Sequence, residues 1–490
     1  MMRSTFCIKS DNGNHYLFDR SLKIYTPISE KQHHVFQELE KNKDKANISG
    51  GGEDEHYYRK YRWMKEHGFF GKTDMKKKFS GRLSTDNLKY QLANLKQLVF
   101  EVTDSCNLNC TYCAYGHLYT NYDTRLNKKL SFEDGKKIID YILSCMKTDL
   151  HNLSGKPLLI SFYGGEPLLN FEFIRKTVEY VKSLDTNKEF WFSMTTNALL
   201  LSRHIDFLVE HNFRLLISLD GDETGNGYRV FHNSRPAYQK IKENIDFVRD
   251  KYPDYFRDSV NFNAVLHDKN DVESILRFFR KTYDKVARIA PLNNSGISEE
   301  STSEFNRMMK NIDEKQLARK DNFRDIRKDL FLNLPSFAAV STFLIQNTGS
   351  FYNSIPDVFE TNSNIRYTPT GTCIPFSKKM FISVNKKVMF CERIGHEFYA
   401  GSIDDLDQRL DEVTEHYNES LDKLEKQCRS CYMNESCSLC MYFIEDLHGK
   451  PRCGFHVSEK KYREYLGKIF THLENNREDI LSIRDEVMID

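Results

Sequence analysis

Three cysteines within eight residues could hold an iron–sulfur cluster. They are Cys106, Cys110 and Cys113, and they follow the apolar run 97–100. A [4Fe–4S] cubane usually takes four thiolates, one for each iron. Three cysteines therefore leave one iron open, and an open iron is a place where another molecule can bind. The spacing alone also fits a zinc site or a chance arrangement, so the companion residues matter.

A second group of seven cysteines lies between residues 373 and 453. It comprises Cys373, Cys391, Cys428, Cys431, Cys437, Cys440 and Cys453. Seven is three more than one tetrahedral zinc needs, which favours larger clusters over a zinc finger with spare thiols. The two remaining cysteines, Cys7 and Cys145, stand alone and are expected to be ordinary thiols.

The composition indicates a globular protein without a strong overall charge. Its 490 residues include 71 Lys and Arg against 70 Asp and Glu, with 39% hydrophobic and 29% charged residues. No net field favours nucleic acid, which disfavours an enzyme that acts on RNA. There is no 18-residue apolar run and no pattern of a signal peptide, so we expect a cytoplasmic protein without a membrane partner. In that compartment, metal explains clustered cysteines better than disulfides do.

Strand and helix patterns alternate from residue 95 onward, which predicts parallel strands with right-handed crossovers. Six strands are expected at 97–103, 158–163, 190–195, 214–219, 260–266 and 286–292, with helices near 132–147, 171–184, 203–211, 237–250 and 271–283. Ser131, with Asp134 three residues later, resembles a capping-box start for the first helix. Six such units fit an α/β fold with a partial (β/α)6 TIM-like barrel, whose chemistry lies at the carboxyl ends of the strands.

Polar residues follow the predicted strands and would face one mouth. Gly164, Gly165 and Glu166 follow the second strand, Thr195 to Asn197 the third, and Ser218 to Gly221 the fourth, with Arg229 beyond. Two glycines let a ligand approach the backbone, and Glu166 offers a carboxylate. The glycines alone also fit an ordinary turn. Taken jointly, the placements favour a small-molecule site beside the cysteine triad.

Over residues 95–295 the sequence resembles the radical SAM superfamily. Its CxxxCxφC motif matches the triad, with Tyr112 as the aromatic residue, and the loop from Gly164 to Pro167 looks like the element that meets the methionyl amine. The resemblance implies that S-adenosylmethionine (SAM) chelates the open iron of a [4Fe–4S] cluster and is cleaved to a 5′-deoxyadenosyl radical, which abstracts hydrogen from substrate. It also implies these cofactor contacts: Tyr112, Tyr115, Gly164, Gly165, Glu166, Asn197, Ser218, Arg229 and Leu292.

The second cysteine group resembles the SPASM extension of radical SAM peptide maturases, which holds two auxiliary [4Fe–4S] clusters. By that resemblance Cys373, Cys391 and Cys440 bind the first, and Cys428, Cys431, Cys437 and Cys453 bind the second. Three ligands would leave an open iron in the first auxiliary cluster. Two features depart from the family pattern: Lys386 stands where a glycine is usual, and two residues instead of three separate Cys437 from Cys440.

Glu392 directly follows Cys391, where sulfatase maturases carry an aspartate thought to take a proton. It is a catalytic candidate by that resemblance. The plain alternative is a solvated carboxylate, since glutamates are mostly exposed.

The chain is expected to fall into five parts. They are a winged-helix-like element at 1–90, the radical SAM partial barrel at 91–295, a bridging insert at 296–372, the SPASM domain at 373–456 and a closing helix at 457–490. The first part, three short strands and then helices, resembles the recognition element of ribosomal-peptide maturases, which captures a leader peptide as an added strand. A structural wing that binds no ligand is the alternative.

These resemblances imply a radical SAM/SPASM oxidoreductase that modifies a ribosomally made precursor peptide, forming a thioether or a carbon–carbon crosslink. The expected partners are a precursor peptide with a leader and a reductant such as flavodoxin or ferredoxin. One alternative is an anaerobic sulfatase-type maturase that forms formylglycine. Another is a scaffold that binds the clusters without catalysis.

Overall fold

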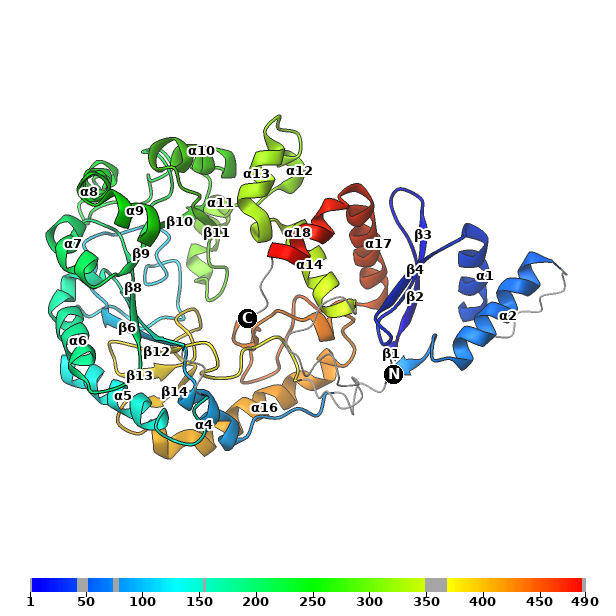
Figure 1. Cartoon of the computed structure of the whole chain (residues 1–490), viewed down its shortest axis with the longest axis horizontal. Coiled ribbons are helices and arrows are strands. Elements are labelled where there is room, and N and C mark those ends of the chain that lie inside the picture. The colour runs from blue at the N-terminus through cyan, green and yellow to red at the C-terminus, as the bar shows by residue number, and fades with distance from the viewer. Residues whose placement is uncertain (1, 42–51, 74–78, 153–155, 349–367, 487–490) are drawn as a thin grey trace. The chain divides into compact units, whose positions relative to one another are not determined.

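The protein divides into two compact units in this computed structural model, which describes residues 2–41, 52–73, 79–152, 156–348 and 368–486 (Figure 1). The sheet unit comprises residues 83–329 and 373–417. The terminal unit comprises residues 1–82, 330–372 and 418–490. Each is described by itself below.

The sheet unit is built on one nine-stranded sheet. Its order is β11 (Arg288–Pro291), β10 (Val260–Leu266), β9 (Arg214–Ser218), β8 (Phe190–Thr196), β7 (Leu158–Gly164), β6 (Gln97–Thr103), β12 (Met380–Ile382), β13 (Lys387–Met389) and β14 (Tyr399–Ser402). The strands β6 to β11 lie side by side in sequence order and pair in parallel. This confirms the six predicted strands and an α/β fold with a central, mostly parallel sheet.

Helices α5 to α10 lie along the outer side of this sheet (Figure 1). The helices of the sheet unit are α4 (Thr85–Ala93), α5 (Phe132–Cys145), α6 (Phe171–Ser183), α7 (Leu201–Glu210), α8 (Tyr238–Lys251), α9 (Pro253–Ser259), α10 (Val272–Tyr283), α11 (Thr302–Met308) and α12 (Glu314–Leu317). The backbone N–H of Asp134 donates to the Ser131 hydroxyl at 3.1 Å, which confirms the predicted cap of α5. Because helices cover the sheet, β6 is buried along almost its whole length.

Part of the second cysteine block extends the same sheet. Strand β12 pairs in parallel with β6, with Met380 opposite Leu98, and β13 and β14 follow in antiparallel pairing. The backbone N–H of Val384 also donates to the Glu101 carboxylate at 2.9 Å. Residues 380–402 therefore lie beside the strand that leads into the cysteine triad.

The terminal unit contains a three-stranded antiparallel sheet and a two-stranded pair. Its elements are β1 (Met2–Arg3), β2 (Thr5–Lys9), β3 (His15–Asp19), β4 (Ile24–Ile28), α1 (Glu30–Lys41), α2 (Glu53–Glu66), β5 (Lys72–Thr73), α14 (Pro335–Asn347), α17 (Glu459–Asn475) and α18 (Glu478–Glu486). The helices α13 (Phe323–Leu330) and α16 (Leu410–Cys428) cross from one unit to the other along the chain. The three N-terminal strands, α1 and the closing helix confirm the predicted elements.

Helices cover both faces of the sheet formed by β2, β3 and β4. On one face, Phe36 and Leu39 of α1 and Tyr61 of α2 pack against buried residues of β2 and β3. On the other, the Tyr16 ring stacks on Phe470 of α17 with centroids 4.5 Å apart. Strand β4 pairs only with β3 in this sheet, so its outer edge carries no strand partner among the described residues.

The predicted insert at 296–372 is only partly described, because residues 349–367 lie outside the described ranges. Its described part contains α11, α12, α13 and α14. None of the described helices combines the length and apolar character needed to cross a membrane.

Candidate active site

The cysteine triad lies on the loop that leaves the carboxyl end of β6, and a second loop holds it in place. The backbone N–H of Asn109 donates to Val230 O at 2.8 Å, and that of Thr111 donates to Tyr228 O at 3.2 Å. The His232 ring also bonds the carbonyl of Cys106, with Nε2 at 2.8 Å from the oxygen. The loop after β9 therefore fixes the backbone of the triad.

The three thiols of the triad are close enough to influence one another's ionisation. Burial, reinforced by the neighbouring thiols, raises the pKa of Cys106 to about 11 and that of Cys110 to about 12. Arg125 Nη2 donates to Cys113 Sγ at 3.1 Å. Three neighbouring thiols with one cation fit a cluster that binds through thiolates.

Within the described ranges, no three His, Cys, Asp or Glu side chains surround a point where a single metal ion could bind. A four-iron cluster binds each thiolate at a different iron, so its ligands stand farther apart than those of one ion.

The glycine loop packs directly on the backbone of the triad loop. The N–H of Gly165 donates to Thr103 O at 2.9 Å, and that of Glu166 donates to Ser105 O at 2.8 Å. A Cβ at Gly164 would lie 2.2 Å from Thr103 O, and one at Gly165 would lie 2.0 Å from Ser105 O. In this structure, the two glycines allow the backbone of the triad loop to come close to the glycine loop.

Glu166 is fully buried and ties β7 to β8. One carboxylate oxygen accepts from the Thr196 hydroxyl at 2.8 Å and from Leu168 N–H at 3.2 Å. The other accepts from Asn197 N–H at 2.8 Å. Burial raises the pKa of Glu166 to about 7 against these hydrogen bonds. The Asn197 amide continues the connection, donating to Asn107 Oδ1 at 2.8 Å and approaching Cys106 Sγ at 3.7 Å.

Arg229 is buried in an ion pair with Asp220. Its Nε and Nη2 lie 3.0 and 3.2 Å from the two Asp220 oxygens, and the Tyr112 hydroxyl donates to the same carboxylate. Burial opposes ionisation of Asp220, but the Arg229 charge and the hydrogen bonds together lower its pKa to about 2. Asp220 lies within residues 218–221, which were singled out from the sequence. The spacing of these residues did not predict that Asp220 pairs with Arg229.

The remaining predicted cofactor contacts are distributed around this network. Leu292 follows β11 and shares an apolar cluster with Tyr112. Ser218 is the last residue of β9 and lies opposite Asn263. Tyr115 is partly buried, and the Arg125 guanidinium stands 4.9 Å from its ring centre. Arg125 was not among the predicted site residues, and no local signal marked it.

Residues 100–281 match the family described as the Radical SAM superfamily. This segment is a radical SAM domain. The cysteine triad and the glycine loop, both singled out from the sequence, lie within these residues.

Several known proteins are similar to parts of the chain. An uncharacterized protein of Methanocaldococcus jannaschii is 36% identical over 144 residues, covering 29% of this chain and 45% of that protein. A cysteine-type anaerobic sulfatase-maturating enzyme of Clostridium novyi is 29% identical over 195 residues, covering 39% and 49%. The radical SAM cyclopropyl synthase TigE of Paramaledivibacter caminithermalis is 25% identical over 197 residues, covering 37% and 41%. The matched region spans less than half the length of each of these relatives.

The solved structure of native anSMEcpe with bound AdoMet shares the fold. It superposes with a TM-score of 0.53 at 18% identity, covering 80% of this chain and all of that one. The similarity supports the arrangement of the radical SAM domain within a larger α/β fold.

Glu392 lies in the sheet unit with the radical SAM domain and is partly buried. Its side chain is 17% exposed, and Lys379 Nζ donates to it at 2.9 Å. Burial raises its pKa, but the Lys379 charge and the hydrogen bonds to the carboxylate together outweigh burial and lower the pKa. Burial and then the charges of Cys391, Glu392 and Cys113 raise the pKa of Tyr122 to about 12, so Tyr122 lies near both the triad and Glu392.

Four cysteines of the second block line one cavity in the terminal unit. The lining consists of Thr370, Gln427, Cys428, Cys431, Met433, Asn434, Cys437, Leu439, Cys453, Phe455 and His456. Burial, with the neighbouring thiols, raises the pKa of Cys428 to about 12. Four thiols around one small cavity fit the donor set of a [4Fe–4S] cluster, and they are the four predicted to share one.

The other predicted auxiliary set is divided between the units. Cys373 and Cys391 belong to the sheet unit, and Cys440 belongs to the terminal unit. Their joint binding of one cluster stays a prediction.

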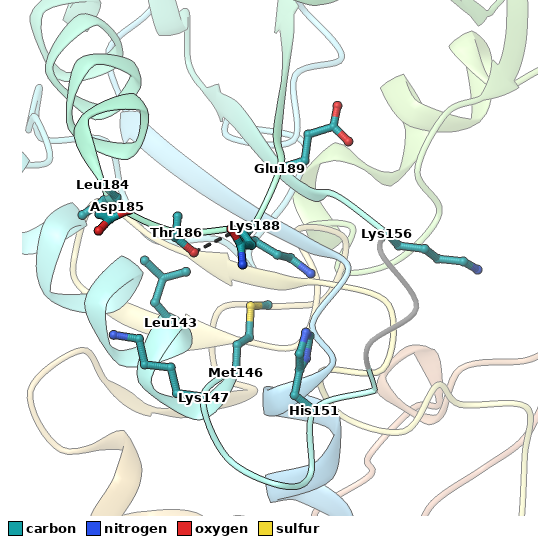
Figure 2. A pocket seen from close by; sticks show the side chains of 11 residues that line it. Leu143, Met146, Lys147, His151, Lys156, Leu184, Asp185, Thr186, Lys188 and Glu189 are labelled. Atoms are coloured by element: carbon teal, nitrogen blue, oxygen red, sulfur yellow. Dashed lines mark hydrogen bonds between the residues drawn. The ribbon is translucent and has the colours of Figure 1, made fainter.

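A separate pocket lies at the amino ends of β7 and β8, where the helices α5 and α6 end (Figure 2). It is lined by Leu143, Met146, Lys147, His151, Lys156, Leu184, Asp185, Thr186, Asn187, Lys188 and Glu189. It contains none of the predicted site residues, which gather at the carboxyl ends of the strands.

Proposed function

We propose that this chain is a radical SAM enzyme that modifies a ribosomally made precursor peptide, forming a thioether or a carbon–carbon crosslink. The observation that carries the proposal is an open edge strand in a chain that contains a radical SAM domain. Strand β4 is exposed along most of its length, and Leu22, Ile24 and Tyr25 on or beside it are 39, 46 and 39% exposed. An edge with exposed apolar side chains suits an extended peptide added as a further strand.

The triad would hold the cluster that binds SAM. When bound, this pair supplies a 5′-deoxyadenosyl radical that abstracts hydrogen from the peptide. Arg229 would orient the anionic end of the cofactor, and the glycine loop would border its amino group. The four-cysteine cavity, with Cys373, Cys391 and Cys440, would hold two auxiliary clusters of a SPASM-type domain. Flavodoxin or ferredoxin would supply electrons.

Glu392 would take a proton from the peptide. The Lys379 ion pair holds it as a carboxylate, which is the form that can accept a proton. In a thioether, the carbon loses a hydrogen atom and the cysteine sulfur loses a proton. One electron remains, and an auxiliary cluster is the natural acceptor.

The experiment uses the anaerobically reconstituted protein with SAM, dithionite and a candidate precursor peptide chosen from the open reading frames beside its gene. We expect 5′-deoxyadenosine together with a peptide that has lost two hydrogens per crosslink. Failure to form 5′-deoxyadenosine with clusters intact would favour a non-catalytic scaffold. Its formation with an unchanged peptide would contradict peptide modification for that substrate.

Formylglycine formation is the second candidate. The similarity to the cysteine-type sulfatase-maturating enzyme of Clostridium novyi favours it, and so does the position of Glu392. Conversion of a short sulfatase-motif peptide that carries no leader would rank this function first. An enzyme that acts on a short peptide without a leader would not need an edge strand for binding it, so this function gives the open β4 edge no role.

A further inference from the structure

We propose that Asp220 is a positioning residue for SAM binding, acting by fixing Arg229 and Tyr112 beside the cysteine triad. The inference rests on the proposed radical SAM function, and no part of it depends on the identity of the peptide.

All bonding positions of the Asp220 carboxylate are used within the protein. One oxygen accepts from Arg229 Nη2 at 3.2 Å and from Val265 N–H at 2.9 Å. The other accepts from Arg229 Nε at 3.0 Å and from the Tyr112 hydroxyl. A carboxylate with about four acceptor positions has none left for a ligand. Asp220 therefore acts through its partners.

Arg229 retains donors that Asp220 does not use. A guanidinium has five N–H donors, and the Asp220 bonds occupy two of its three nitrogens. Its Nη1 makes no hydrogen bond within the part of the chain that the structure describes. An arginine held on one edge by a buried carboxylate presents its other edge in a fixed direction, which suits a second carboxylate such as that of SAM.

The backbone of Asp220 also anchors the loop that fastens the triad. Its N–H donates to Asn226 Oδ1 at 3.3 Å, and its carbonyl accepts from Asn270 Nδ2 at 3.1 Å. The same loop continues to Tyr228 and Val230, whose carbonyls bond the triad backbone. Because Tyr112 stands between Cys110 and Cys113, its bond to Asp220 joins the arginine directly to the cluster loop.

The test substitutes Asp220→Asn, which keeps the size and removes the charge. An amide places an N–H donor against the Arg229 donors, so the arginine loses its fixed direction. We expect the dissociation constant for SAM to rise at least about tenfold. The iron content and the maximal rate of 5′-deoxyadenosine formation at saturating SAM should stay near those of the wild type. The thermal unfolding midpoint of the apo protein should fall, because Arg229 is left as a buried unpaired charge.

A spectroscopic measurement and a matched control complete the design. The electron paramagnetic resonance signal of the reduced cluster should require at least about tenfold more SAM to change. Asp268→Asn is the control, because Asp268 accepts from the Tyr228 hydroxyl in the same region without contacting Arg229. It should leave SAM binding unchanged.

A double variant tests whether Asp220 acts through Arg229. Asp220→Asn combined with Arg229→Gln should bind SAM no more weakly than Arg229→Gln alone, since the shared contact is already lost. This pair buries no unpaired charge, so it serves even if Asp220→Asn alone does not fold. Three outcomes would overturn the proposal: an unchanged SAM affinity in Asp220→Asn, a double variant that binds SAM more weakly than Arg229→Gln alone, or a loss of iron that parallels the loss of SAM binding. Because no peptide is present, these results stand apart from any failure of peptide modification.

Discussion

The glycine pair shows how single residues place the site. Gly164 has φ of +134°, a region that side chains other than glycine rarely adopt, and both glycines touch the backbone that leads into the triad. The geometry of the loop is thereby coupled to the geometry of the cysteines. A methyl group at either position would separate β7 from the triad loop.

Gly165→Ala tests this coupling. The new Cβ would lie 2.0 Å from Ser105 O, which is backbone and cannot rotate away. We expect the apo protein to lose about 3 kcal/mol of unfolding free energy and the reconstituted protein to bind SAM poorly. Gly71→Ala is the control, since its nearest neighbour would be 3.5 Å away. Equal stability of both variants in thermal unfolding would contradict the close packing.

Glu392→Gln tests the proposed proton acceptor. An amide keeps the shape but cannot take a proton, so peptide modification should fall at least about 100-fold. Formation of 5′-deoxyadenosine should continue, because the substitution leaves the triad intact. Glu397→Gln, an exposed carboxylate on the same loop, is the control. Mass spectrometry of the products measures 5′-deoxyadenosine and modified peptide separately. Unchanged peptide modification by the Glu392→Gln variant would show that Glu392 is not the proton acceptor.

Among the elements, strand β4 differs from the other strands of its sheet in exposure. Residues of β2 and β3 are largely buried beneath helices, whereas β4 leaves its edge and apolar side chains in solvent. An exposed apolar edge strand promotes unwanted pairing with other chains. A protein that keeps such an edge is therefore expected to bind a partner there.

Ile24→Asp tests the leader-binding edge. The substitution places a charge on an apolar contact surface, and we expect the KM of a leader-bearing precursor to rise about tenfold. Turnover of the leaderless peptide should not change. Phe247→Asp on α8 is the control, because it alters an apolar residue of similar exposure, 43%, outside this sheet. Unchanged kinetics with the leader would identify the three-stranded sheet as a structural wing.

The strands and helices of the sheet unit were largely predictable because they depend on local patterns. The bounds of β6 and β10 were predicted correctly: β6 is a continuous buried run, and β10 alternates buried with more exposed residues. The addition of β12 to β6 was not predicted, since a short parallel pairing between residues 98 and 380 leaves no trace in either segment. The helix α9 was also missed, because its seven residues are too short for a clear period.

At the scale of the whole molecule, the cysteine triad and the four cysteines of the cavity lie in separate compact units. The triad belongs to the sheet unit, and the four-cysteine cavity belongs to the terminal unit. Each set has its thiols brought together by its own unit, so the two clusters should load independently.

Iron analysis tests this independence. Wild-type protein with three cubanes should bind about 12 irons, and a variant with Ala at all three triad positions should retain about 8. Replacing the four cavity cysteines should likewise leave about 8, with the triad cluster intact. Cys145→Ala is the control and should change nothing. A wild-type content far below about 8 irons would contradict the three-cluster proposal.

The sequence by itself determined the kind of chemistry and the order of the parallel strands. Cysteine spacing sets which ligands one short loop can offer, and side-chain periodicity sets which segments become strands, so both are local properties. The tertiary structure alone decided which partners those residues meet. It paired Arg229 with Asp220, Glu392 with Lys379 and Cys113 with Arg125, and it placed Cys428 and Cys453 around one cavity. These contacts join residues 9 to 25 positions apart through burial and hydrogen bonding, which depend on how the chain packs and not on any spacing within it.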